Sequence, residues 1–361
     1  MNLKKTALFA IAVIVGGCVS VPAPSSPEEI TPQPAAATQP GIYKFTIVAG
    51  VADSGWRDEG NGFSAEINTQ VPAISSGIKE TQNLMQNVDL LTSDRAGLAF
   101  VYDYHIVLAN EGKLMSAFPD APTEKITIKC GTEMVRPMFP EYSEPARIVL
   151  PLYEEQLHIL VSVSSGITSV KELRGKHIST GEAGSATEQL ARFLISGLGI
   201  DWETEISREQ FDLATAMLAL ENGEIDALLW SGYVPHAELL DFWSALETEF
   251  VLIPITEDDA DAIIQANPGV FHQSKIPAGM YSSAQEDVNT LATTVVLAAM
   301  EDFPEEYATQ ILAAFFGQPT ASWKSRFPVT PDAAIALLGT ESQSYLHRGA
   351  ASYFIEAGVL R

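Results

Sequence analysis

Short apolar segments alternate with amphipathic helical patterns along the chain from Tyr43 onward. Apolar runs bounded by turn residues predict strands at residues 43–50, 70–74, 96–101, 157–162, 225–230 and 250–255. Helical patterns follow most of these strands, and acidic clusters at 257–261 and 302–306 mark helix starts in the last third. Alternating β and α units are typical of mostly parallel sheets with helices on both faces, and the restart at residue 157 indicates a second α/β lobe.

The segment 177–188 combines a short strand, a turn of small residues and the start of a helix. Gly181 and Gly184 allow the backbone to approach a ligand closely, and Ser185 or Thr187 is placed to cap the helix. The unpaired N–H groups and partial positive charge at a helix N-terminus favour a carboxylate or a phosphate. The segment is therefore a candidate anion site, with a well-capped structural unit that binds no ligand as the alternative.

Motifs for nucleotides, metals and covalent catalysis do not fit the sequence. Ser185 stands where a P-loop requires lysine, and Gly181 with Gly184 supplies only half of a dinucleotide fingerprint. The His residues are scattered, and neither a paired-Cys pattern nor the nucleophile elbow of the α/β-hydrolases is present. No cofactor and no metal are expected, and an enzyme on the same two-lobed fold is kept as the weaker alternative.

The N-terminus carries the pattern of a secreted lipoprotein. Two lysines precede an apolar run at 7–15, which is too short to span a bilayer, and small residues lead into Cys18. We expect residues 1–17 to be a signal peptide and Cys18 to be acylated, with an incidental Cys as the alternative. Residues 18–42 are rich in Pro, Ala, Ser and Thr and form a disordered linker, so the protein is expected on the periplasmic or cell-surface side of a bacterial membrane.

The chain is strongly acidic, with a formal net charge of −25. This charge excludes nucleic acid as a partner, and it requires any anion site to be a local island of positive potential. Cys130 is the other cysteine and is expected to be a buried small hydrophobe, because a lipidated Cys18 leaves it no partner for a disulfide.

Several segments, taken in order, resemble the TAXI branch (TRAP-associated extracytoplasmic immunogenic proteins) of the solute receptors of TRAP transporters. The resemblance covers most of the chain from Tyr43 to about Leu360. Its segments are residues 152–153, 157–161, 167–176, 181–188, 220–227, 232–233, 276–281 and 286–288.

This resemblance implies an α/β, two-lobed periplasmic binding protein of type II-like fold, with a hinge between the lobes. The first lobe would comprise 43–156 and the returning segment 253–361, and the second lobe 157–252. Such a monomer captures a small carboxylate-bearing solute, a glutamate-like amino acid or a dicarboxylate, and delivers it to the membrane subunits of a TRAP permease. The residues placed at the cleft by the resemblance, or by their position after the third strand, are Ser54, Trp56, Arg57, Ser75, Ser76, Tyr102, Asp103, Tyr153, Gly184, Ser185, Thr187 and Tyr233.

Arg57 is the residue expected to pair with the solute's carboxylate, because a guanidinium grips a carboxylate bidentately. Arg57→Ala would then abolish binding and leave the fold intact. A solvent-facing cation is the alternative for Arg57, and core packing is the alternative to a ligand-stacking wall for Trp56.

Two departures from the family pattern bear on the ligand. Tyr102 and Asp103 stand where a polar Gln-Ser-Asp cluster is expected, and Ala186 replaces a glycine in the segment before the helix. A lipid-anchored sensor that passes the signal to a receptor stays open as an alternative to transport, since the sequence does not separate the two.

Overall fold

The computed structural model describes residues 42–50, 55–93, 95–117, 124–127, 133–136, 145–245, 250–281, 286–317, 319–320, 323–324 and 327–361. Pro40–Arg361 forms one compact unit. The predictions for the signal peptide, the linker, Cys18, Ser54 and Cys130 fall outside the described residues. No helix within the described ranges is long and apolar enough to cross a membrane.

The first lobe begins with three parallel strands in the order β2-β1-β3, each followed by a helix. Its elements are β1 (Tyr43–Val48), α1 (Gly55–Gln70), β2 (Ile74–Lys79), α2 (Leu84–Thr92), β3 (Leu98–Tyr102), α3 (Asp103–Asn110) and α4 (Leu114–Ala117). A separate antiparallel pair follows, formed by β4 (Glu124–Thr127) and β5 (Glu133–Arg136).

The second lobe repeats the α/β pattern around β9, β7 and β8, which pair in parallel. Its elements are η1 (Val163–Ser165), η2 (Val170–Leu173), β7 (His177–Ser179), α5 (Ala186–Gly197), β8 (Ser207–Glu209), α6 (Leu213–Glu221), β9 (Ala227–Gly232), α7 (Ala237–Ala245), β10 (Phe250–Leu252), α8 (Glu257–Ala266) and β11 (His272–Ile276).

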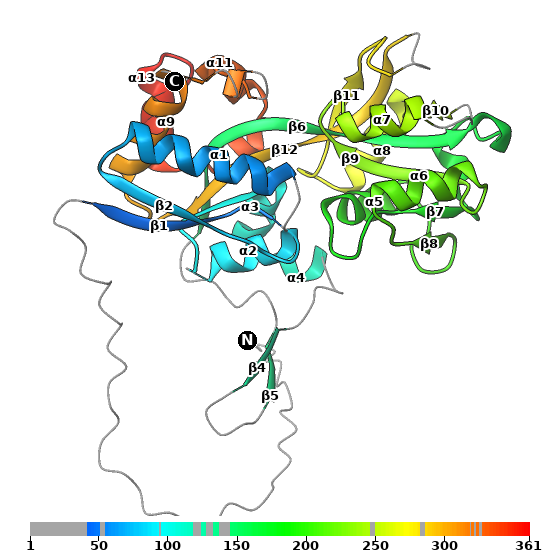
Figure 1. Ribbon diagram of the computed structural model, residues 1–361, viewed down its shortest axis with the longest axis horizontal. Coiled ribbons are helices and arrows are strands. Elements are labelled where there is room, and N and C mark those ends of the chain that lie inside the picture. The colour runs from blue at the N-terminus through cyan, green and yellow to red at the C-terminus, as the bar shows by residue number, and fades with distance from the viewer. Residues whose placement is uncertain are drawn as a thin grey trace, which may run out of the picture. The chain divides into compact units, whose positions relative to one another are not determined.

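Two long strands, β6 (Ala146–Ser162) and β12 (Val288–Met300), run through both lobes and pair with each other in antiparallel fashion (Figure 1). β12 pairs with β3 near one end, and the later half of β6 pairs with β9. The sheet therefore continues from one lobe to the other in the order β2-β1-β3-β12-β6-β9-β7-β8.

The chain ends in helices that pack on the first lobe, where α9 contacts both α1 and α13. These helices are α9 (Glu305–Gly317), α11 (Pro331–Ala336), α12 (Thr340–Gln343) and α13 (Arg348–Glu356). The whole of 253–361 is expected from the sequence to belong to this lobe. α8 instead packs on α5, where Asn267 Nδ2 donates to Phe193 O at 3.0 Å. We propose that the lobes divide within β6 and β12, which leaves α8 and β11 with the second lobe.

Two α/β lobes joined by crossing strands constitute the type II periplasmic binding protein fold, and the predicted fold class is confirmed. The sheet is mixed and not mostly parallel, because the long central strands β6 and β12 pair antiparallel with their neighbours. Ser75 and Ser76 lie within β2, so the prediction of a strand that ends at residue 74 is wrong. β2 is an edge strand, and an edge tolerates the polar residues that read as a turn in the sequence.

Candidate functional site

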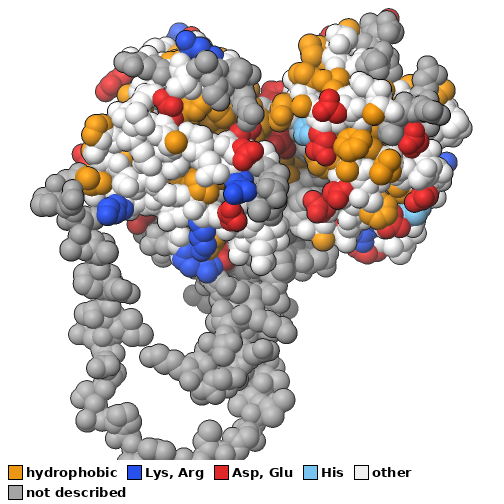
Figure 2. All heavy atoms as spheres, viewed as in Figure 1, with side chains coloured by type: hydrophobic (Ala, Val, Ile, Leu, Met, Phe, Trp, Pro, Cys, Tyr) orange, Lys and Arg blue, Asp and Glu red, His pale blue; other side chains and the backbone are white. Residues whose placement is uncertain are grey.

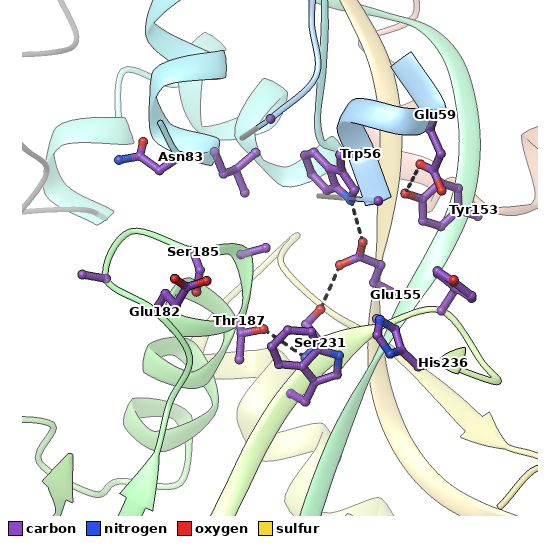
Figure 3. Close-up of a pocket in the computed structure, with 18 of the residues that line it drawn as sticks. Trp56, Glu59, Asn83, Tyr153, Glu155, Glu182, Ser185, Thr187, Ser231 and His236 are labelled. Carbon is purple, nitrogen blue, oxygen red and sulfur yellow. Dashed lines mark hydrogen bonds between the residues drawn. The ribbon is translucent and has the colours of Figure 1, made fainter. Parts of the chain in front are cut away.

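A pocket of about 410 Å³ lies where the start of α1 and the middle of β6 meet the start of α5 and the end of β9. Its walls come from both lobes, as Figure 3 shows. The lining residues are Gly50, Gly55, Trp56, Glu59, Gln82, Asn83, Leu84, Tyr153, Glu155, Glu182, Ala183, Ser185, Ala186, Thr187, Trp230, Ser231, Gly232, Tyr233 and His236.

Glu155 lies on β6 in the wall of this pocket and is 5% exposed. Trp56 Nε1 donates to Glu155 Oε1 at 2.8 Å, and Ser231 Oγ donates to Glu155 Oε2 at 3.0 Å, from opposite sides in Figure 3. The Tyr102 hydroxyl also donates to Oε2. Burial raises the pKa of Glu155, and the three hydrogen bonds counteract that rise because they favour the charged form.

A second carboxylate, Glu59 of α1, faces the same pocket and accepts a hydrogen bond from the Tyr153 hydroxyl at 2.7 Å. Burial raises the pKa of Tyr153 well above its usual value, and the charge of Glu59 adds to the effect. The tyrosine therefore stays protonated and acts as a donor. Glu182, which is exposed, places a third carboxylate in the lining.

The start of α5 forms the second-lobe wall. Ser185 is the N-cap, and its Oγ accepts from Glu188 N at 3.1 Å, as the sequence predicts. Gly184 has φ of +73°, and a Cβ there would lie 3.2 Å from Asn83 Nδ2 of the first lobe, so this position requires glycine. The N–H groups of Ala186 and Thr187 lie in the first turn and have no intrahelical acceptor.

No Lys or Arg is among the described residues that line the pocket. Arg57, the expected carboxylate partner, is outside the lining, and its Nε pairs with Glu80 Oε1 at 3.0 Å. Asp and Glu side chains are spread over both lobes on the face seen in Figure 2, whereas Lys and Arg form separate small groups. The pocket wall is therefore electronegative, and within the described lining the only local positive character comes from backbone and side-chain N–H groups.

The structure brings together some of the sequence-predicted site residues. Those that line the pocket are Trp56, Tyr153, Ser185, Thr187 and Tyr233. Tyr102 reaches the site through its hydrogen bond to Glu155.

Other predicted residues lie elsewhere. Asp103 is buried at the start of α3, where Ser342 Oγ donates to it at 2.8 Å. Ser76 Oγ lies 2.8 Å from Ser64 Oγ on α1, and Ser75 shares its strand outside the lining. Gly184 shapes the loop before α5 and is not in the lining itself. These positions provide structural contacts around the pocket.

Sequence reasoning missed several lining residues, including Glu59, Glu155, Trp230 and His236. Glu155 gave no separate signal, because the same strand also carries Glu154, Gln156 and His158. Trp230 Nε1 and His236 Nδ1 are buried and have no hydrogen-bond partner among the described residues. Burial also lowers the pKa of His236, which favours its neutral form. In the described residues, no group of His, Cys, Asp and Glu is arranged to hold a metal ion.

Three solved structures illustrate the similarity of the chain to known proteins. XAC2383 from Xanthomonas citri, bound to chloride ion, is 10% identical, with 88% of this chain and 99% of that one covered and a TM-score of 0.46. The periplasmic aliphatic sulphonate binding protein SsuA from Escherichia coli is 13% identical, with 90% and 76% covered and a TM-score of 0.40.

The ligand-binding core of GluR0 from Nostoc punctiforme, in complex with L-glutamate, is 14% identical, with 78% of this chain and 96% of that one covered and a TM-score of 0.41. All three TM-scores are below 0.5, so these structures say nothing about the ligand of this chain. The fold follows from the strand order described above. The sequence profile described as the NMT1-like family matches residues 139–358, which is more than half of the chain. The protein belongs to the NMT1-like family.

Proposed function

We propose that the protein is an extracytoplasmic solute-binding protein that captures a small organic solute in the pocket between its lobes. The observation that carries the proposal is the pocket itself, whose walls come from both lobes and combine aromatic rings with hydrogen-bonding side chains. Concave sites of this composition are typical of small-molecule binding. The volume of about 410 Å³ lies in the range of small-molecule sites.

Capture would work through the contacts that the two lobes share. Glu155 on the crossing strand already joins Trp56 of the first lobe to Ser231 of the second. Away from the pocket, His105 Nε2 lies 3.0 Å from Gln189 Oε1 and ties α3 to α5. A solute that touches both walls adds to these contacts, and it therefore shifts the equilibrium of the hinge towards the arrangement in which the lobes meet.

The resemblance to the TAXI receptors further supports a role in transport, with delivery of the solute to a TRAP-type permease by a monomer anchored through Cys18. It also implies a carboxylate on the solute. The group that would receive it, in place of Arg57, is the first turn of α5, whose residues Ala186 and Thr187 line the pocket.

A thermal-shift screen followed by calorimetry on the full chain tests the function. Amino acids, 2-oxo acids, dicarboxylates, amines and sulphonates form the panel, and at least one is expected to raise the Tm by mass action. A panel in which no compound raises the Tm would refute solute capture. The anchor is tested separately, because Cys18→Ser should abolish acylation and membrane association while the solute affinity stays unchanged.

A further inference from the structure

The pocket wall holds three carboxylates, from Glu59, Glu155 and Glu182, and its described lining includes no Lys or Arg. Glu155 is the most buried of them, and every hydrogen bond that it accepts from the described residues comes from a neutral donor. A buried carboxylate is costly unless it is paired with a cation or fully hydrogen-bonded. Among the described residues, Glu155 has hydrogen bonds but no protein cation beside it.

The three donors also fix the direction in which Glu155 faces. Two of them occupy Oε2 and one, from Trp56, occupies Oε1. A carboxylate offers about four lone-pair sites, so one site on Oε1 is left for a further donor on the pocket side. The ring of Trp56 is held edge-on to Tyr102, with centroids 5.4 Å apart at 85°, which keeps the indole next to that oxygen.

Aromatic rings surround the same space. Trp56, Tyr153, Trp230 and Tyr233 all line the pocket, and Tyr153 and Tyr233 meet edge to face at 6.5 Å. The face of an aromatic ring attracts a positive charge, most strongly when the charge has lost its water. Carboxylates and ring faces in one cavity are the chemistry that recognises an ammonium group, whereas a solute with two carboxylates would meet repulsion from Glu59 and Glu155.

We propose, building on the function proposed above, that the solute is an organic amine of zero or positive net charge whose ammonium group binds Glu155 among these rings. A carboxylate at the start of α5 is compatible with this, since a zwitterion places its two charges at opposite walls. A dicarboxylate is not. The alternative is that Glu155 only holds α1, β3 and β9 together through its hydrogen bonds and does not contact the solute.

Calorimetry with a matched ligand series on the wild-type full chain tests the proposal. Glutarate, 5-aminopentanoate and 1,5-diaminopentane differ mainly in whether each end is a carboxylate or an ammonium. The pair 2-aminopentanoate and 2-oxopentanoate differs at the ammonium alone, and neither compound has a second carboxylate. The ammonium-bearing compounds are expected to bind at least about 10-fold more tightly than glutarate and 2-oxopentanoate, because leaving a buried charge unpaired costs more free energy than a change in affinity of about 10-fold.

A charge-neutral variant then separates binding from structure. Glu155→Gln keeps the size of the side chain and should weaken ammonium binding by about 10-fold or more. The control Glu306→Gln removes one exposed negative charge outside the pocket lining and should leave affinity within about 2-fold. If Glu155→Gln fails to fold, the wild-type ligand series still decides.

The outcomes are distinct. Binding of only the two ammonium-free acids, or equal binding of all five compounds, would overturn the amine inference while solute capture stands. Ammonium binding unchanged in a folded Glu155→Gln protein would make Glu155 a structural tie and overturn its role. If none of these compounds binds but a sulphonate or another acid of the wider panel does, the amine inference fails alone. If nothing in either panel binds, both proposals fail.

Discussion

Asp103→Asn should stabilise the protein at neutral pH, although a buried, hydrogen-bonded carboxylate is being removed. Asp103 is 6% exposed, and burial raises its pKa from 3.8 to about 6 despite the hydrogen bond from Ser342. In the unfolded chain the group titrates near its ordinary value, so the folded state holds the proton over a wider range of pH. The contribution of Asp103 to stability is therefore fully present below about pH 4 and is lost as the pH rises through about 6.

The magnitude follows from the shift of roughly two units, which corresponds to about 3 kcal/mol at full ionisation. Asparagine is neutral at every pH, and its Oδ1 still accepts from Tyr104 N, which lies 2.9 Å from Asp103 Oδ1. Urea unfolding at pH 4.5 and 7.5 should give a variant more stable than the wild type at pH 7.5 by up to about 3 kcal/mol, and a smaller difference at pH 4.5.

Asp241 on α7 is exposed, and Asp241→Asn is the control. It should change the free energy of unfolding by less than about 0.5 kcal/mol at both pH 4.5 and pH 7.5. An Asp103→Asn protein that is less stable than the wild type at pH 7.5 would refute the reasoning, because it would mean that the ionised carboxylate gains more from its donors than it loses by burial.

Three further predictions concern the pocket. Arg57→Ala should leave solute affinity within about 2-fold, contrary to the expectation from the sequence, because a partly exposed ion pair outside the lining contributes little to binding. A loss of binding in calorimetry would return Arg57 to the site. Ser185→Ala removes the cap of α5 and should cost about 1 kcal/mol of unfolding free energy; an unchanged denaturation midpoint would contradict the capping role. Amine affinity should fall on acidification from pH 8 to 5, since burial raises the pKa of Glu155 and protonation removes its charge. Glu59 and His236 face the same pocket, so any pH dependence of affinity that remains in Glu155→Gln is due to them. A wild-type affinity that does not change with pH would count against a charge interaction between the amine and Glu155.

Much of the fold followed from local sequence pattern. The strand from Tyr43 and the helix beginning after Ser185 were predicted because apolar spacing and capping act within a few residues. The antiparallel strand β12 was not, since its residues are buried along almost the whole strand and show no alternation that separates a strand from a buried helix. The strand predicted at 70–74 ended too early for the opposite reason, because β2 is an edge strand whose Ser75 and Ser76 are polar and half-buried.

The site was predicted less completely than the fold. Trp56 and Tyr153 were placed at the cleft by resemblance alone, and both line the pocket. Arg57 was predicted to bind the carboxylate of the solute because it is a cation next to Trp56 in the loop before α1. Its partner Glu80 comes from the loop after β2, and only the tertiary structure reveals this contact. Glu155 was missed because its neighbours come from β3, α1 and β9, which are distant in sequence.

The strand β6 has a consequence for how fast a solute leaves. Because β6 belongs to both lobes, Glu155 sits at the pivot, where a hinge rotation displaces atoms least. The rim residue Ser185 belongs to the start of α5 in the second lobe, not to β6, and moves away from the first lobe when the lobes part. Substitutions at the rim residue Ser185 should therefore change mainly the dissociation rate constant of the solute. Substitutions at Glu155 should change which solutes are bound at equilibrium.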